Sequence, residues 1–493
     1  MINLIKKIND EKNTLKKIFC LVILFFGINM FLNFATDTYA VFKDGFGTSA
    51  KDMFFRNGRA IIALIYELHY LSGFSNETFY YISSILAIFF LGLTIWLMQK
   101  LLKEYNITEN RGILLSFISI ANIFIIEYFM FIEKCGFMLA ILFNVLGTYC
   151  MSNFYRNKGQ KYFYFAILSI CLAIFTYQGT IALFVLLTLP FAYKNSDGFK
   201  NYILRIIEIG IVYGIAISLD MLAFKFLFKS IRFIEKQNYI MNLKSVIKNL
   251  TYIKTIIDSI LPNHLFEIVL LVMLLIDVIL VGINKNKIMR LISIIILLIS
   301  AFIFPMATII QGSGWSSMRV IYPMASIIGV LIIDIYLNNQ MNTNNINYFK
   351  IIDKFIMITI MILLANQYLS FNKIYIDKYR LNISDENRAN YIGEAIIDYQ
   401  NSTGNEITKI AFYKDESMAT PSYPNLYCIG DLVISSFNAE WSDIDALNYY
   451  LGTNFEKIEQ ENKYIDYFSS KNWDRLSQEQ LIFEGNTLHI CVY

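Results

Sequence analysis

The chain is poor in charged residues and in cysteine. Only 16 % of its 493 residues are charged and 56 % are hydrophobic, whereas about 25 % of the residues in a typical soluble domain are charged. This balance excludes an ordinary soluble protein. Six cysteines are too few for a disulfide scaffold. The net charge of +3 is too small to indicate nucleic acid as a partner.

Common catalytic and nucleotide-binding motifs are also missing. The sequence contains no P-loop, no Rossmann glycine fingerprint, no HExxH and no GxSxG. It has no C-x-x-C pair and no His-rich tract that would indicate a metal. We therefore expect no cofactor and predict no metal ligands, while leaving a divalent metal open.

The hydrophobic residues form runs that are long enough to cross a membrane as helices. Runs of about 18–22 residues match a hydrocarbon core of roughly 30 Å. We predict about eleven spans, at residues 18–34, 79–98, 112–131, 135–152, 162–177, 180–193, 202–224, 265–283, 289–309, 319–337 and 351–370. The first run is expected to be an uncleaved span, and the alternative is a signal peptide.

The distribution of charge predicts the orientation and two domains. Short connections on one side hold most of the lysines and arginines, so the amino terminus is expected in the cytoplasm. Residues 371–493 hold 10 basic and 19 acidic residues, and the first 370 hold 32 basic and 20 acidic ones. We predict a transmembrane domain over 1–370, with long outer loops at 35–78 and 225–264, and an extracytoplasmic domain over 371–493.

The pattern of residues 371–493 is typical of a small α/β domain. Ser384, followed by two acids, predicts the start of a helix. The segments 407–413, 431–437 and 487–492 predict strands. The expected architecture is therefore a polytopic α-helical membrane protein with a small C-terminal α/β domain.

Three carboxylates near the predicted outer surface are candidates for catalysis, because charge at membrane depth is costly. Asp37 lies where the first span ends, Glu133 lies at a tight outer turn, and Glu127 lies in an otherwise apolar run. A carboxylate can act as a general base when its surroundings tune its pKa. The alternatives are a solvated residue for Asp37, an ion pair at the turn for Glu133, and a partnered buried acid for Glu127.

Four cations on the same side are candidates for phosphate binding. Arg56 and Arg59 precede an amphipathic segment, Lys134 lies at the tight outer turn, and Arg319 opens a late span. Arginine binds phosphate and carboxylate through two parallel hydrogen bonds. The alternatives are ion pairs with neighbouring acids and, for Arg319, a side chain that snorkels to the interface.

Two further places are candidates for sugar binding. Tyr177 and Gln178 lie in a turn between two short apolar runs and offer hydrogen bonds to hydroxyl groups. Trp315 lies in a glycine-containing loop and can stack on a sugar ring. The alternatives are a polar turn between helices and an interfacial tryptophan.

The order of these motifs along the chain resembles that in the GtrII family of bacterial membrane glucosyltransferases. The motifs that carry the resemblance are Asp37, Gly58-Arg59-Ala60, Glu127 to Lys134, Thr176-Tyr177-Gln178-Gly179, Met318 to Pro323, and Ala365-Asn366-Gln367-Tyr368. They cover most of residues 20–375 and none of the acidic tail. The first loop of the family often has paired acids, whereas Asp37 here precedes Thr38. One base is enough for a direct displacement.

The resemblance implies a GT-C-like transferase in the bacterial cell membrane. Such an enzyme moves a glucosyl or related hexosyl group from a polyprenyl-phosphate donor to a cell-envelope glycan outside the lipid bilayer. Asp37 is then the first choice of general base and Glu133 the second. The alternative function is a transporter or a flippase for a lipid-linked sugar. A flippase has little use for long outer loops, and we find no repeat of the kind that transporters often show.

Overall fold

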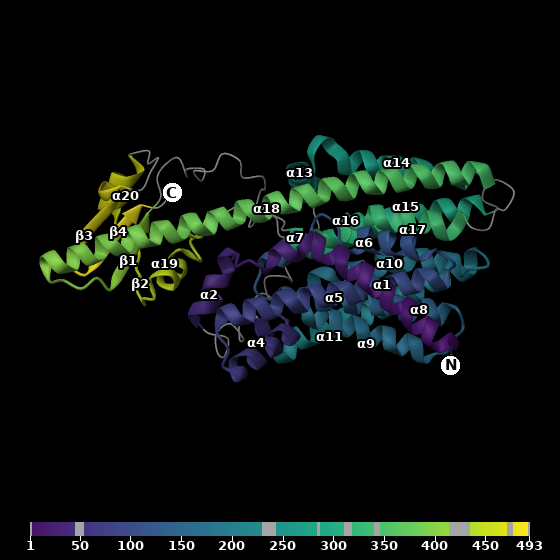
Figure 1. Ribbon diagram of the computed structural model, residues 1–493, viewed down its shortest axis with the longest axis horizontal. Coiled ribbons are helices and arrows are strands. Elements are labelled where there is room, and N and C mark those ends of the chain that lie inside the picture. Colours follow the sequence, from purple (N-terminus) through teal and green to yellow (C-terminus); the bar gives the residue numbers. More distant parts are fainter. Residues whose placement is uncertain are drawn as a thin grey trace.

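The computed structural model describes residues 2–44, 54–228, 243–282, 286–309, 318–339, 346–413, 434–470 and 477–491. In these ranges the chain forms a bundle of helices and, near its carboxyl end, a four-stranded sheet (Figure 1). The helices that position the site are α1 (Ile2–Phe26), α2 (Thr36–Asp44), α4 (Ala60–Ser72), α5 (Asn76–Glu104), α6 (Glu109–Ile120), α7 (Ile125–Met130) and α8 (Lys134–Tyr155). The later helices are α9 (Lys161–Thr176), α10 (Ala182–Lys194), α11 (Phe199–Ala223), α13 (Leu243–Ile260), α14 (Leu265–Val281), α15 (Lys287–Ile309), α16 (Met318–Ala325), α17 (Ile327–Asn339) and α18 (Ile346–Thr403).

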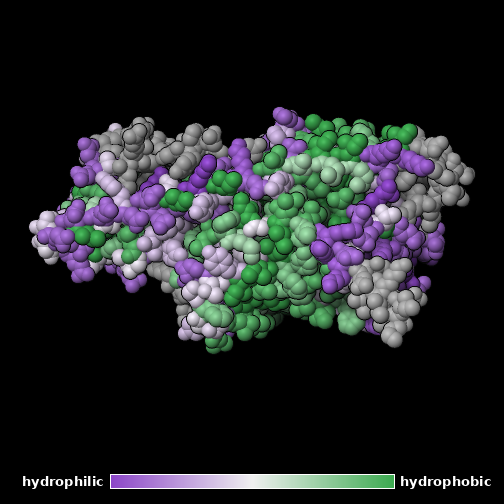
Figure 2. Space-filling model, viewed as in Figure 1, coloured by the Kyte–Doolittle hydropathy of each residue, from purple (hydrophilic) through white to green (hydrophobic). Residues whose placement is uncertain are grey.

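Seven helical segments of the described ranges are long and apolar enough to cross a membrane. They are Glu11–Met30, Asn76–Glu104, Lys134–Tyr155, Phe199–Leu227, Pro262–Val281, Met318–Asn338 and Lys350–Thr403. Figure 2 shows the matching surface, with hydrophobic residues over the middle of the bundle and hydrophilic residues toward both ends of the molecule. The chain therefore has the architecture of a helical membrane protein, and the count of about eleven spans stays a prediction.

Two of the predicted spans are interrupted, and their breaks face each other. The predicted span at 112–131 is divided into α6 and α7, and the predicted span at 319–337 into α16 and α17. The buried amide of Asn122 joins the breaks, because its Nδ2 donates to the Tyr322 carbonyl at 3.1 Å and to the Ser326 hydroxyl at 2.8 Å. Pro323 lies in α16 and contributes no backbone N–H.

The freed backbone groups at this break are bonded within the protein. The carbonyl of Ala121 accepts a hydrogen bond from the Gln367 amide of α18. Non-helical backbone at membrane depth needs such internal partners, because lipid offers none. The two breaks therefore leave α7 and α16 as short helices inside the bundle, and these helices carry Glu127 and Arg319.

One long helix connects the bundle to the four-stranded sheet. That the carboxyl end is a separate domain stays a prediction, and the name C-terminal domain is used below for the described residues from 404 to 491. Helix α18 has 58 residues, packs beside α14 and continues beyond the bundle to the sheet (Figure 1). The prediction that a helix begins at Ser384 is wrong, because α18 passes through this position without a break. The reason is that Asp385 does not cap its own helix; its carboxylate accepts from the Ser435 hydroxyl at 2.6 Å and the Ser436 N–H at 2.8 Å.

The C-terminal sheet has the strand order β2-β1-β4-β3. Its strands are β1 (Lys409–Tyr413), β2 (Glu456–Lys457), β3 (Leu481–Glu484) and β4 (Thr487–Cys491). Strand β1 is parallel to β2 and β4, and β3 and β4 form an antiparallel pair. The strands predicted at 407–413 and 487–492 are confirmed. The prediction at 431–437 is wrong where the chain is described, because Ser436–Asn438 forms a 3-10 helix after the Ser435 side chain caps Phe437.

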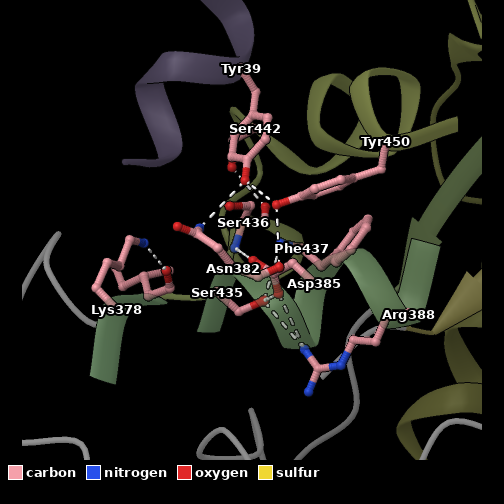
Figure 3. A network of polar contacts seen from close by, with 11 residues as sticks. Tyr39, Lys378, Asn382, Asp385, Arg388, Ser435, Ser436, Phe437, Ser442 and Tyr450 are labelled. Carbon is pink, nitrogen blue, oxygen red and sulfur yellow. Dashed lines mark hydrogen bonds and ion pairs between the residues drawn. The ribbon is translucent and has the colours of Figure 1, made fainter. Parts of the chain in front are cut away.

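Polar contacts join this domain to the segment that follows the first span. The amide of Asn382 on α18 pairs with the backbone of Phe34 in both directions, at 2.9 and 3.1 Å. Figure 3 shows Tyr39 of α2 and Tyr450 of α19 (Asp443–Leu451) meeting above this asparagine. The C-terminal domain is therefore docked at the end of the bundle where α2 begins.

Candidate functional site

The first part of the site is the contact between α7 and α16. Glu127 is 1 % exposed, and its Oε2 accepts the backbone N–H of Arg319 at 2.7 Å. The guanidinium Nε of Arg319 lies 3.6 Å from the other carboxylate oxygen. The hydroxyl of Tyr128 donates to the Arg319 carbonyl. These contacts fix the backbone and the side chain of Arg319 at the start of α16.

Two arginine side chains lie over aromatic rings in this region. The guanidinium carbon of Arg319 is 4.3 Å from the centre of the Phe131 ring, and that of Arg59 is 4.9 Å from the centre of the Tyr177 ring. Tyr177 is buried and its ring meets Phe137 edge to face at 4.7 Å. Cation–π contacts of this kind orient a guanidinium group without neutralising its charge. Aromatic rings thus orient both arginines, and the carboxylate of Glu127 also lies beside Arg319.

A glycine turn brings Arg59 to the Tyr177 segment. Gly58 has a φ of +79°, and a Cβ atom there would lie 2.5 Å from Gln178 Nε2 and 2.6 Å from the Phe224 ring. The same amide of Gln178 donates to the Asn57 carbonyl at 3.2 Å. Only glycine fits this turn without strain. The predicted Gly-Arg and Tyr-Gln motifs thus contact each other directly.

Glu133 lies beside this pair of motifs. It is 5 % exposed and its Oε2 accepts a hydrogen bond from the Tyr66 hydroxyl of α4 at 3.1 Å. Burial raises the pKa of the Glu133 carboxyl above its ordinary value, while the charges of Arg59 and Arg319 lower it and the charge of Asp37 raises it. Glu133 therefore lies within electrostatic range of three of the predicted site residues.

Asp37 lies at the border between the bundle and the C-terminal domain. It is exposed in the first turn of α2. Its neighbour Thr36 is buried, and the Thr36 hydroxyl accepts from the indole N–H of Trp441 at 3.3 Å. Of the three predicted carboxylates, Asp37 is exposed, whereas Glu127 and Glu133 are buried. The carboxylate of Asp37 is thus open to solvent.

Lys134 is directed to a different environment. Its side chain is fully buried, its ammonium lies 3.6 Å from the centre of the Tyr80 ring, and among the described residues no acceptor bonds its Nζ. The Tyr80 hydroxyl donates to the Phe31 carbonyl at 2.9 Å. Phe31 lines a mostly apolar cavity of about 240 Å³ between the end of the first span and α18, which Asn33 and Tyr375 also line.

Two predicted site residues remain. Arg56 is exposed and Trp315 lies outside the described residues. Tyr66, Phe131 and Tyr128 were not predicted. Tyr66 had a usable signal, because it follows Arg59 by seven residues, or two turns of the predicted amphipathic helix. Tyr128 of α7 and Phe131, which follows α7, lie in an apolar run, and the sequence did not reveal the helix break in this run.

Two groups of His and carboxylate residues in the described part of the chain have ligand atoms close enough for a metal ion. They are Asp258, His264 and Glu267, and Glu461, Glu484 and His489. In each group a lysine ammonium already bonds a carboxylate, Lys254 at 2.8 Å and Lys463 at 2.7 Å. We therefore assign no metal to either group, and neither includes a predicted site residue.

Neither a family model nor a curated protein nor a solved structure matches this chain. The side chains that meet at the broken helices are therefore the basis for inferring function. They provide two cations oriented by aromatic rings, the exposed carboxylate of Asp37 and two buried carboxylates. This combination can bind an anion and transfer a proton.

Proposed function

We propose that this chain is an integral membrane glycosyltransferase that moves a hexosyl group, glucosyl in the first instance, from a polyprenyl-phosphate donor to a cell-envelope glycan. The observation that carries the proposal is that the rings beneath Arg59 and Arg319, Tyr177 and Phe131, both pack on Phe137. The charges of both arginines and of the exposed Asp37 also act on the pKa of the buried Glu133 carboxyl. These residues come from separate motifs of the ordered set that resembles the GtrII family. Their proximity is what a shared active site requires.

The donor needs a cationic site for its phosphate and an apolar site for its chain. Arg59 and Arg319 provide the cations, and each is oriented by an aromatic ring. Phosphate suits guanidinium because its oxygens match the two-pronged donor geometry. The cavity beside Phe31 and Tyr375 provides apolar surface for the start of the polyprenyl chain. Lys134, the fourth predicted phosphate ligand, is buried against the Tyr80 ring, so we assign it no contact with the phosphate.

The reaction is a single displacement at the anomeric carbon. The acceptor hydroxyl gives its proton to the carboxylate of Asp37 while its oxygen bonds to the anomeric carbon. The bond from that carbon to the phosphate oxygen breaks, and its electron pair leaves with the polyprenyl phosphate. The two arginines stabilise the charge that develops on the phosphate. General base catalysis of this kind contributes roughly 10²–10⁴ in rate.

The buried carboxylates take supporting roles in this scheme. Glu127 bonds the backbone and lies beside the side chain of Arg319, so it positions that cation. Glu133 is the second choice of base, because burial keeps it from direct contact with solvent. Tyr177 and Gln178 line the approach to Arg59 and are placed to contact the sugar.

The proposal includes an orientation, with the amino terminus in the cytoplasm of a bacterial cell and the C-terminal domain outside. A thiol reagent that does not cross membranes tests it in intact cells, after the exposed Cys20 is replaced by alanine. We expect labelling of Lys463→Cys in the C-terminal domain and no labelling of Lys17→Cys in α1. The reverse pattern would contradict the orientation.

The activity is tested in membranes of the source cells with polyprenyl-phosphate-[¹⁴C]glucose as donor. We expect label to move onto material that is no longer extracted with lipid, at a rate that depends on this chain. If the label only crosses the bilayer and stays attached to lipid, the protein is a flippase. That result would overturn the proposal. Membranes that carry Asp37→Asn and Glu133→Gln together serve as the control.

A further inference from the structure

The C-terminal domain contains an open pocket at the carboxyl ends of two parallel strands. Phe412 and Tyr413 end β1, Lys457 ends β2, and these residues line a pocket of about 530 Å³. Strands β1 and β2 are parallel, so both end at the same edge of the sheet. Ligands of open α/β sheets bind at this edge. The volume also falls within the usual range for ligand pockets, roughly 300–1,000 Å³.

The charged side chains that line the pocket disfavour the binding of anionic ligands. Glu440, Asp443 and Glu459 line it together with one lysine, Lys457. That lysine is committed to the protein, because its ammonium lies 2.7 Å from both carboxylate oxygens of Asp443 and 2.7 Å from the Glu440 carbonyl. The lining is thus net negative, so a phosphate, a nucleotide or an acidic sugar would be repelled.

The polar groups of the pocket suit hydroxyl groups. Carboxylates accept hydrogen bonds from hydroxyls, and the Gln460 side chain, whose Nε2 donates to the Phe412 carbonyl at 2.6 Å, keeps its oxygen for a further donor. Phe412 and Phe437 add apolar lining between these groups. An apolar wall with a few directed acceptors fits an uncharged sugar unit.

An exposed tryptophan connects the pocket with the proposed base. Trp441 follows the pocket residue Glu440, is 54 % exposed, and donates its indole N–H to Thr36, the residue before Asp37. An indole ring offers a flat apolar face on which a sugar ring can stack. A glycan lying in the pocket and over Trp441 would therefore extend toward Asp37.

We propose that this pocket and Trp441 form a binding site for an uncharged saccharide and hold the acceptor glycan for transfer at Asp37. The acceptor role rests on the proposed function, whereas binding of a saccharide by the C-terminal domain does not. Measuring saccharide binding in the absence of a glycosyl donor separates binding by the C-terminal domain from the acceptor role.

The test is saturation-transfer NMR on the full-length protein in nanodiscs. The probes are the methyl glycosides of glucose, galactose, rhamnose and N-acetylglucosamine, and glucose 6-phosphate as an anionic probe. We expect at least one uncharged glycoside to give a signal, and glucose 6-phosphate to give none. Absence of a signal from all four glycosides, or a stronger signal from the phosphate or from the cationic probe spermidine, would overturn the proposal.

Variants locate the site and separate it from the transfer reaction. Trp441→Ala and Glu440→Gln are each expected to weaken binding of that glycoside about tenfold, and Trp441→Phe is expected to weaken it less. Glu394→Gln, which changes an exposed acid on α18, is the control and should leave binding unchanged. Equal binding in Trp441→Ala, Glu440→Gln and the native chain would refute the assignment. If glycoside binds as expected and no donor label is transferred, the saccharide site stands and the proposed transferase activity fails.

Discussion

The hydroxyl oxygens of Tyr39 and Tyr450 lie 2.6 Å apart, and this contact joins helix α2 of the bundle to helix α19 of the C-terminal domain. Tyr39 is two residues beyond Asp37, so the domain contact also fixes the turn that carries the proposed base. The Asn382 carbonyl accepts from Tyr450 at 3.3 Å and extends the contact to α18. The network of polar contacts in Figure 3 therefore helps to hold the start of α2, which carries Asp37, in position.

Loss of Asp385 should weaken the contact between the C-terminal domain and the bundle. Asp385→Ala leaves the Ser435 hydroxyl and the buried Ser436 N–H without their acceptor. Unsatisfied groups of this kind cost about 1–3 kcal/mol. We expect a lower thermal midpoint in detergent and faster proteolysis between the domains. Asp398→Ala, an exposed position on the same helix, is the matched control and should leave the midpoint unchanged.

The turn at Gly58 should tolerate no side chain. Gly58→Ala adds a left-handed backbone penalty of roughly 1–2 kcal/mol and a clash with Gln178 and Phe224. The control is Gly73→Ala, where φ is +68° and nothing lies within 4 Å of the new Cβ. We expect both variants to lose stability, and Gly58→Ala alone to lose transfer activity. Equal activity in the two variants would show that the Arg59–Tyr177 contact is not needed.

Substitution of Arg319 should weaken binding of the donor. Arg319→Lys keeps the charge but loses the two-pronged geometry that suits phosphate. A charge-assisted hydrogen bond contributes about 1.5–3 kcal/mol, so we expect the KM for the donor to rise roughly 10–100-fold. Initial rates over a range of donor concentrations measure this effect. Arg380→Ala, whose side chain is 58 % exposed, is the control. A normal KM in Arg319→Lys would remove Arg319 from the phosphate site.

The secondary structure was predictable in the segments where the hydrophobic pattern of the sequence alone determines it. The long apolar segments form helices, and two of the predicted strands, near 410 and 490, are present as β1 and β4. The break between α6 and α7 was not predictable, because it depends on Asn122 bonding Tyr322 and Ser326, residues that lie two hundred positions away. The continuity of α18 was missed for a related reason. Asp385 looked like a residue of a helix start, but its partners are on another segment.

Candidate site residues could be named from the sequence, but their arrangement in space could not. Charge in apolar sequence identified Arg59, Glu127, Glu133 and Arg319. The cation–π partners and the hydrogen bond from Tyr66 to Glu133 depend on tertiary packing, which sequence spacing does not encode. The pocket of the C-terminal domain was missed because its residues come from two strands and the approach to α19.

The raised pKa of Glu133 should make stability depend on pH. A carboxyl with a higher pKa in the folded chain binds its proton more tightly there than in the unfolded chain, so folding is favoured at lower pH. The free energy of unfolding should therefore fall as pH rises from the ordinary glutamate value through the raised one. Glu133→Gln should lack this component when thermal midpoints are compared between pH 4.5 and 7. A native chain that gains stability over this range relative to Glu133→Gln would contradict the argument.

The rate of hexosyl transfer by Asp37→Asn and by Glu133→Gln tests the central claim most directly. The assay uses polyprenyl-phosphate-[¹⁴C]glucose in membranes that hold equal amounts of each chain, with Glu394→Gln as a control for an exposed acid. We predict that Asp37→Asn lowers the rate by roughly 10²–10⁴ and that Glu394→Gln has no effect. Full transfer activity in both Asp37→Asn and Glu133→Gln would contradict the account.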